Sequence, residues 1–342
     1  MRILVTGGAG FIGSHLVRRL LANASDSVVN LDALRYSGNL ENLADVTGHP
    51  RYTFVQADIC DAPTVAKVMK EHRIEGVINC AAETHVDRSI VEPGAFAKTD
   101  VIGTAVLLDE ARRIGVTQFL HVSTDEVYGS VESGSSKEGD LLDPRSPYSA
   151  SKAGGDLLVR SYWTTYQFPV VITRGSNTYG PNQYPEKFIP LFVTNALDDQ
   201  PLPMYGDGRY RRDWLSVFDH CAGIEHVFRH GEPGAIYNIG GGNERENVAV
   251  ADLILAHLGK PKSLIRFVQD RPGHDRRYAV DCSRLRALGW APAVPFEEGL
   301  RATVDWYRNN QSWWHKIKSG EFRAYYEQMY GQRLKDGTAC AS

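Results

Sequence analysis

The feature that most constrains this chain is a glycine-rich turn between a short apolar run and an amphipathic segment. Residues 6–13 read TGGAGFIG, in which Gly8, Gly10 and Gly13 fit GxGxxG and Gly7, Gly10 and Gly13 fit GxxGxxG. Such a turn lets the backbone approach a pyrophosphate closely, and the helix that follows offers unpaired N–H groups and a positive dipole end. The turn therefore predicts dinucleotide binding, with a purely structural turn as the alternative.

Short β-type runs and helical patterns alternate through the first half of the chain. This alternation predicts an α/β fold, a Rossmann-type doubly wound parallel sheet with helices on both faces. The expected strands are 2–6, 27–31, 52–57, 76–80, 118–123 and 169–173, and the expected helices cover about 11–21, 62–71 and 96–114 and begin near 147.

Beyond Gly175 the pattern becomes irregular and rich in proline, glycine and aromatic residues. We expect residues 1–175 to form the NAD-binding domain, with some later segments returning to it. Residues 176–330 are expected to form a smaller, mixed α/β C-terminal substrate domain, and residues 331–342 a tail. The segment after about Trp314 is polar and aromatic, and we expect it to be loosely attached.

Composition excludes several classes of protein. The chain has 342 residues and a net charge of −3, which argues against a broadly basic nucleic-acid binder. Five cysteines without a CxxC pair argue against a disulfide framework and a cysteine-based metal site. No run approaches the ~18 apolar residues of a membrane span, and the start does not fit a signal peptide. We expect a soluble, cytoplasmic protein with no metal, membrane or nucleic-acid partner.

Asp32 indicates which dinucleotide is bound. It stands 19 positions after Gly13, close to the ~20 expected for an acid that binds the adenosine ribose. Its carboxylate can accept hydrogen bonds from a free 2′-hydroxyl and would repel a 2′-phosphate, which favours NAD over NADP. Arg35 weakens this argument, because an arginine can hold the phosphate. We expect NAD.

Tyr148 and Lys152 lie four residues apart on a predicted helix and therefore share one face. A free tyrosine has a pKa near 10, and a nearby ammonium or an oxidised nicotinamide favours its phenolate form. With the glycine-rich turn and Ser123-Thr124 at a strand end, the pair resembles the extended short-chain dehydrogenase/reductase family over about residues 1–315. The resemblance implies that Lys152 also binds the nicotinamide ribose and that Thr124 helps to hold the reacting hydroxyl.

Two carboxylates, Asp125 and Glu126, follow Thr124 where active sites form in open α/β sheets. Adjacent carboxylates can be driven to different pKa values, which leaves one as an acid and the other as a base. A ketone at C4 of a hexose acidifies the hydrogen at C5, so such a pair can expel the C6 hydroxyl as water. A solvated acidic turn is the alternative.

Within the extended family, the chain is similar to the dTDP-glucose 4,6-dehydratases, NAD-dependent hydro-lyases in which the Asp is the acid and the Glu is the base at C5. The resemblance implies dTDP-glucose as substrate and dTDP-4-keto-6-deoxyglucose as product. It also implies a homodimer formed through helices that include the Tyr-x-x-x-Lys segment. The order of the two acidic roles rests on this resemblance, since spacing does not reveal it.

The resemblance also implies the binding residues. Thr178 stands where the family has a second Asn, which puts one nicotinamide-side hydrogen bond in doubt. The implied cofactor contacts are Gly7, Gly10, Phe11, Ile12, Gly13, Asp32, Arg35, Asp58, Ile59, Ala81, Ala82, Glu83, Thr99, Tyr148, Lys152 and Thr178. The implied substrate contacts are Thr84, Thr124, Asn177, Lys187, Phe188, Pro203, Tyr205, Arg212, Asn247, Asp270, Arg271, His274 and Tyr278.

Several alternatives stay open at this point. A nucleotide-sugar 4-epimerase would share the glycines, Tyr148 and Lys152 but would not need Asp125 and Glu126. A non-catalytic NAD-binding sensor or scaffold would bind the dinucleotide without turnover. Thymine and uracil cannot be separated from the residues alone, and His85 fits a structural role as well as a substrate contact.

Overall fold

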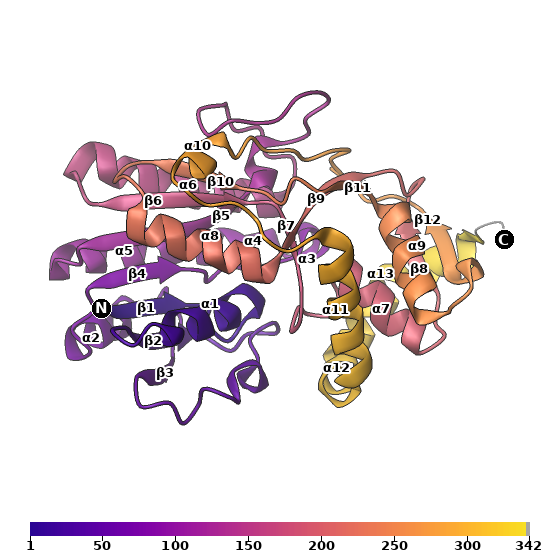
Figure 1. The fold of residues 1–342 in the computed structure, drawn as a ribbon, viewed down its shortest axis with the longest axis horizontal. Helices are drawn as coiled ribbons and strands as arrows, with labels where there is room; N and C mark the ends of the chain where they lie inside the picture. The colour runs from indigo at the N-terminus through magenta and orange to yellow at the C-terminus, as the bar shows by residue number, and fades with distance from the viewer. Residues whose placement is uncertain (340–342) are drawn as a thin grey trace.

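The computed structural model describes residues 1–339, so Cys340 and the end of the expected tail lie outside the described residues. Two lobes lie side by side (Figure 1). The larger lobe is built on seven parallel strands in the order β10-β6-β5-β4-β1-β2-β3, which confirms the predicted fold class. These strands are β1 (Arg2–Thr6), β2 (Ser27–Asp32), β3 (Tyr52–Gln56), β4 (Gly76–Asn79), β5 (Gln118–Thr124), β6 (Val170–Gly175) and β10 (Ile236–Ile239).

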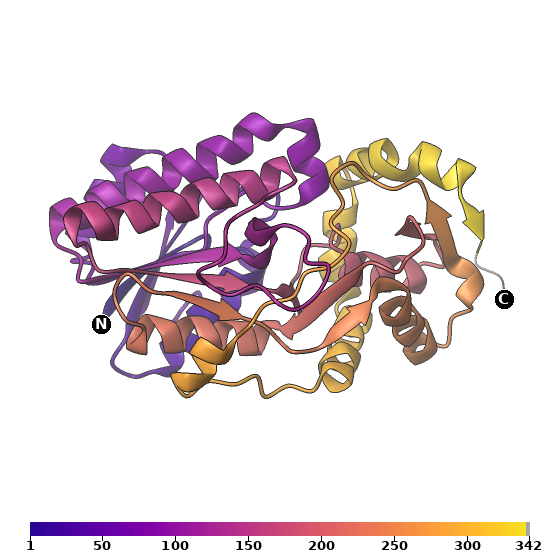
Figure 2. The same cartoon turned by 90° about the horizontal axis from the view of Figure 1, so that it is seen from above.

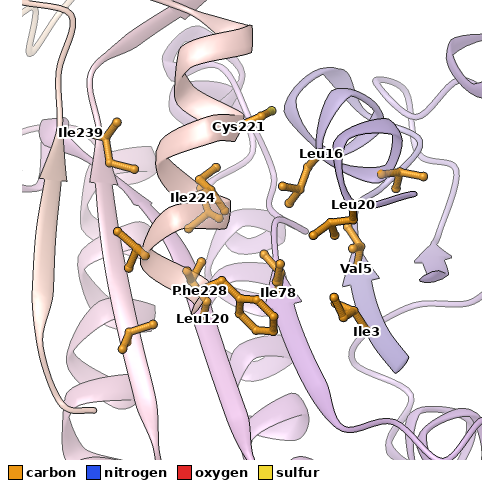
Figure 3. Packing of buried hydrophobic residues seen from close by; sticks show 14 of the residues in the cluster. Ile3, Val5, Leu16, Leu20, Ile78, Leu120, Cys221, Ile224, Phe228 and Ile239 are labelled. Atoms are coloured by element: carbon orange, nitrogen blue, oxygen red, sulfur yellow. The ribbon is translucent and has the colours of Figure 1, made fainter. Parts of the chain in front are cut away.

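Both faces of this sheet are buried because successive residues of each strand alternate between them. In β1, Ile3 and Val5 pack on one face and Leu4 packs on the other. Helices α1 (Phe11–Ala22) and α8 (Val217–His230) supply side chains to the first face (Figure 3), and α10 (Ser283–Ala287) adds Leu285. The second face is covered by α2 (Ala62–Glu71), α5 (Thr104–Ile114) and α6 (Pro147–Tyr166).

Strand β1 pairs with β2 on one side and with β4 on the other, so the direction of winding reverses at this point. In open α/β sheets, ligands bind in the crevice outside the carboxyl ends of the strands at such a reversal. The glycine-rich turn follows β1, and Asp125 and Glu126 follow β5. The topology therefore places both sequence motifs at the same edge of the sheet.

The smaller lobe holds two three-stranded sheets, β11-β9-β7 and β13-β12-β8. Both contain parallel and antiparallel pairs, in agreement with the predicted mixed α/β character. The strands are β7 (Asn177–Tyr179), β8 (Leu202–Tyr205), β9 (Arg211–Ser216), β11 (Glu244–Glu246), β12 (Ile265–Val268) and β13 (Thr338–Ala339). The helices are α7 (Phe188–Leu197), α9 (Asn247–Leu258), α11 (Phe296–Asn309), α12 (Gln311–Lys318) and α13 (Glu321–Asp336).

Short helical elements connect the main ones. They are η1 (Leu40–Leu43), α3 (Val86–Val91), α4 (Pro93–Phe96), the π-helix η2 (Ala97–Gly103), η3 (Asp125–Tyr128) and η4 (Lys262–Leu264). The chain also passes repeatedly between the lobes, since α8 and β10 return to the larger lobe after β9, and α10 returns after β12 (Figure 2). The domain boundaries expected from the sequence stay a prediction.

The segment after Trp314 differs from the expectation of loose attachment. Trp314 is fully buried, and Phe322 and Tyr330 of α13 are 3% and 5% exposed. Phe322, Tyr326 and Tyr330 recur every four residues, so they lie on one face of α13 and pack into the core of the smaller lobe. Within the described residues, no helix combines the length and apolar character needed to cross a membrane.

Candidate active site

A cavity of about 290 Å³ lies at the carboxyl ends of the central strands. Every residue predicted to contact the cofactor lines it, from the glycine-rich turn to Thr178. Thr124, Asp125, Glu126, Tyr148 and Lys152 line the same cavity. The fold thus brings the expected cofactor residues and the expected catalytic residues to one place. Their individual roles stay predictions.

The glycine-rich turn is too tight for larger residues. Gly7 has a φ of +67°, and its N–H donates to the Leu31 carbonyl at 2.9 Å. A Cβ atom on Gly13 would lie 2.2 Å from the Gly7 carbonyl oxygen. Backbone therefore takes the space that side chains would fill, directly before α1. This cradle fits the pyrophosphate of a dinucleotide.

Asp32 and Arg35 lie where the adenosine ribose is expected. The two Asp32 oxygens accept from the N–H groups of Ala9 and Leu34 at 2.9 and 2.8 Å, and burial raises the pKa of Asp32. Arg35 donates to Glu83 at 2.6 Å and to Asp58 at 2.8 Å. The cation that could have held a 2′-phosphate is already paired with two carboxylates.

Helix α6 presents Tyr148 and Lys152 in its first two turns. Ser146 caps the helix, since its hydroxyl accepts from the Ser149 N–H at 3.1 Å while the Ser149 hydroxyl accepts from the Ser146 N–H at 3.0 Å. Lys152 donates to the Val122 carbonyl at 2.8 Å, and burial lowers its pKa.

The surroundings of Tyr148 differ from the expectation that Lys152 favours the phenolate. Burial and then the Glu126 carboxylate raise the pKa of Tyr148 well above 10. The bond from Lys152 to Val122 directs its ammonium toward the end of β5. Burial and the Glu126 carboxylate therefore oppose the phenolate form of Tyr148, and positive charge beside the phenol would favour it.

Asp125 and Glu126 have unequal surroundings although they are neighbours. Asp125 is 2% exposed, and its Oδ2 finds no hydrogen-bond partner in the described part of the chain. Burial, then Glu126 and Asp213, raise the pKa of Asp125 well above its usual value. Burial also raises the pKa of Glu126, but the cationic groups of Arg271, Lys187 and Arg212 oppose that rise. These surroundings favour retention of a proton more strongly at Asp125 than at Glu126.

The predicted substrate residues fall into two groups. Thr84, Thr124, Asn177 and Lys187 line the cavity, whereas the others are not among its lining residues. Three of the latter lie beside Glu126 on the side of the smaller lobe. The Tyr278 hydroxyl donates to Asp275 at 2.8 Å and lies 3.5 Å from Glu126. The Arg212 guanidinium lies 4.4 Å from the centre of the Tyr278 ring, and Arg271 acts on Glu126 through its charge.

The remaining predicted substrate residues engage other parts of the smaller lobe. His274 contacts Asp270 at 2.7 Å and stacks on Tyr210 with ring centres 3.8 Å apart. Phe188 packs against Phe192 and Trp214. The others are placed by the strands and helix they belong to: Pro203 and Tyr205 in β8, and Asn247 at the start of α9. A direct substrate contact by any of them stays a prediction.

Sequence reasoning missed several groups at the site. Gln183, Tyr184 and His220 line the cavity. Thr178 Oγ1 lies 2.7 Å from Nδ1 of His220, so the residue that departs from the family pattern is held by an unpredicted histidine. No short-range signal marks these residues, because they reach the cavity only through the fold of the second half.

The sequence analysis gave no role to Asp87, Arg88 and Glu186, although they lie in segments that it discussed. Arg88 pairs with Glu186 at 2.7 Å, and Arg271 pairs with Asp87 at 3.0 Å. The two ring nitrogens of His85 contact the Glu186 carbonyl and the Tyr325 hydroxyl, each at 3.2 Å, which fits the structural role for this histidine. Among the described residues, no cluster of His, Cys, Asp and Glu is placed to hold a metal ion.

Known proteins match the chain over almost its whole length. The family described as GDP-mannose 4,6 dehydratase matches residues 4–303. A dTDP-glucose 4,6-dehydratase from Actinoplanes sp. is 51% identical, over 92% of this chain and all of its own length. The chain belongs to the dTDP-glucose 4,6-dehydratase family. The resemblance expected from the sequence is confirmed.

Solved structures separate this family from its relatives. The dTDP-glucose 4,6-dehydratase DesIV from Streptomyces venezuelae, crystallised with NAD, has a TM-score of 0.91 at 51% identity and covers 93% of this chain and all of its own. A UDP-glucose 4-epimerase from Thermotoga maritima has a TM-score of 0.85 at 32% identity and covers 91% of this chain and all of its own. The fold is shared with epimerases, whereas the sequence agrees better with the dTDP-glucose 4,6-dehydratases.

Proposed function

We propose that this protein is an NAD-dependent dTDP-glucose 4,6-dehydratase, which converts dTDP-glucose into dTDP-4-keto-6-deoxyglucose and water. One observation carries the proposal. Two neighbouring carboxyl groups in unequal surroundings, Asp125 and Glu126, line the same cavity as Tyr148 and the dinucleotide cradle. A 4-epimerase needs no such acid–base pair, so this pair favours elimination over epimerisation.

Each catalytic residue has its own proposed step in the reaction. Bound NAD supplies a hydride acceptor for C4 and later a hydride donor for C6. Tyr148 takes the proton of the C4 hydroxyl, which Thr124 holds in place. Glu126 removes the proton at C5 and returns it to C5 when C6 is reduced. Asp125 gives its proton to the departing C6 hydroxyl, and the proton that Tyr148 has taken balances this loss. The sum is loss of one water with no net oxidation, so the dinucleotide is regenerated.

The paired state of Arg35 supports NAD as the cofactor. Arg35 already binds Asp58 and Glu83, so it is a poor ligand for a 2′-phosphate. The buried Asp32 carboxylate would also repel that phosphate. DesIV, with NAD bound, points the same way. Arg212, Arg271 and Lys187, with His274 nearby, are proposed to hold the nucleotide diphosphate.

The decisive experiment is incubation of the purified protein with dTDP-glucose. The dehydratase releases a 4-keto-6-deoxy sugar, which gains a characteristic absorbance in base. A C4 epimer as the only product would favour the epimerase. Dinucleotide binding without turnover of dTDP-glucose or UDP-glucose would favour a sensor or scaffold.

We also propose a homodimer formed through η2 and α6. Ile102 and Leu157 on these packed elements are 56% and 51% exposed, and Tyr166 at the end of α6 is 50% exposed. Burial of apolar side chains of this size against a partner subunit would stabilise the dimer.

The four described cysteines are free, which supports a reducing, cytoplasmic location.

A further inference from the structure

The C-terminal helix α13 reaches back from the smaller lobe to the segment that follows β4. In Figure 2 this helix is the yellow one along the outer edge of the smaller lobe. Two separate contacts connect α13 to residues 85–88, which come directly after the cavity-lining Thr84. Tyr325 and Arg333 are half-buried, and each contact leads to a buried side chain, His85 or Asp87.

The first contact is made by Tyr325. Its hydroxyl lies 3.2 Å from Nδ1 of His85, and its ring lies 4.1 Å from the Arg88 guanidinium. The Tyr36 ring covers the other side of Arg88 at 3.8 Å. His85 has a φ of +81°, a region that residues other than glycine rarely adopt. The contacts of its ring therefore help to hold a strained backbone next to Thr84.

The second contact runs from Arg333 through Tyr205 to Asp87. Arg333 donates to the Tyr205 hydroxyl at 2.8 Å, and that hydroxyl donates to Oδ2 of Asp87 at 2.9 Å. The other Asp87 oxygen accepts from Arg271 at 3.0 Å. Asp87 is 1% exposed, and Nε of Arg271 is buried without a hydrogen-bond partner in the described residues. Asp87 thus fixes one end of the Arg271 guanidinium, and the Nε–H group of Arg271 stays available as a donor.

We propose that Tyr325 and Arg333 of α13 are positioning residues of the substrate site, which act through His85 and through Asp87 to hold Thr84 and Arg271 in place. This proposal rests on the proposed function, because Arg271 is taken to bind the nucleotide diphosphate. It follows that α13 contributes chiefly to substrate affinity and reaches Glu126 only indirectly, through the charge of Arg271.

Steady-state kinetics of Arg333→Gln tests the proposal. Loss of the charged donor weakens the support of the Tyr205–Asp87 pair, although Tyr330 still bonds the Tyr205 hydroxyl, and we expect KM for dTDP-glucose to rise about tenfold. The NAD content is expected to stay within about twofold and kcat to change less than KM, because Arg333 contacts none of the groups of the chemical steps. Arg333→Lys should recover part of the affinity, since it keeps a cationic donor.

Arg323→Gln is the matched control, because Arg323 is an exposed arginine on the same helix. If Arg333→Gln is indistinguishable from this control in KM, the proposal is wrong. The double variant Arg333→Gln/Asp87→Asn should cost less than the product of the two single effects, because both changes act on the same hydrogen-bonded chain. Fully multiplicative effects would contradict the coupling.

Two further measurements keep the outcome clear. If Arg333→Gln lowers the melting temperature, KM of Tyr325→Phe becomes the test, because this variant removes one hydroxyl and keeps the ring. An unchanged KM in Tyr325→Phe then overturns the proposal.

Wild-type turnover of dTDP-glucose tests the proposed function separately. Should there be no turnover, amide hydrogen exchange in α13 with and without dTDP still tests the link. Slower exchange with dTDP supports it, and unchanged exchange refutes it.

Discussion

At the scale of single residues, Asp125 and Glu126 carry the same functional group in unequal surroundings. After burial, the Glu126 and Asp213 carboxylates dominate the charge around Asp125, whereas Arg271, Lys187 and Arg212 dominate it around Glu126. The spacing of the two residues could not reveal this difference, because it depends on Arg212 and Arg271 from the smaller lobe. The order of roles that the family resemblance implies, with Asp125 as the acid and Glu126 as the base, stays a prediction.

Exchange of the C5 hydrogen separates the two roles. In Glu126→Gln the base is lost, so exchange of this hydrogen with solvent should slow by about 100-fold or more while NAD is retained. Asp125→Asn is the matched control, because it keeps the base and loses the acid; it should still exchange at C5 and release little product. The exchange is measured by NMR in deuterated water, and wild-type exchange rates in Glu126→Gln would remove this residue from its role.

The stability of the protein should report the raised pKa of Asp125. Since the folded-state pKa lies above the ordinary value of ~3.9, the native state holds this proton more tightly than the unfolded state. The resulting stability is complete below about pH 4 and is lost as the pH rises toward the folded-state pKa. Asp125→Asn has no such loss. Its melting temperature should exceed that of the wild type at pH 8 by more than at pH 4; a constant gap would contradict the raised pKa.

At the scale of elements, the glycine-rich turn depends on backbone contacts that leave no room for a side chain. Gly13→Ala would place a methyl group 2.2 Å from the Gly7 carbonyl oxygen. We expect the variant to lose most of its bound NAD and about 1–3 kcal/mol of stability. Gly48→Ala is the control, because a Cβ there meets no atom within 4 Å. Cofactor content and thermal unfolding of both variants provide the measurement, and equal NAD content would refute the steric argument.

Helices and strands with a clear local sequence pattern could be predicted. Elements that form only by pairing with residues distant in the sequence could not. The expected strands and helices up to Gly175 agree with those of the structure to within a few residues. Strands β7 and β11 have three residues each and exist because β9 pairs with both. Likewise, the polar composition after Trp314 concealed the four-residue spacing of the aromatic face of α13. The cofactor side of the site follows local motifs, whereas Gln183, Tyr184 and His220 reach it only through tertiary folding.

At the scale of the whole molecule, the exposed apolar side chains of η2 and α6 predict self-association. Leu157→Asp should convert the dimer into a monomer, because burying an unpaired carboxylate at the interface is costly. Leu141→Asp is the control, since Leu141 is 91% exposed in a loop and should leave the dimer intact. Light scattering after size exclusion measures the mass of each variant, and a monomeric wild type would contradict the proposed dimer.

The repeated passage of the chain between the lobes limits how the protein can be engineered by exchange of a domain. Because β10 completes the edge of the large sheet next to β6, a fragment that stops after β6 would leave that edge bare and lose the packing of α8. The smaller lobe therefore cannot be replaced through a single junction in the chain, because segments of the two lobes alternate along the sequence. Transplanting a new specificity onto this scaffold requires either several simultaneous junctions or changes made in place.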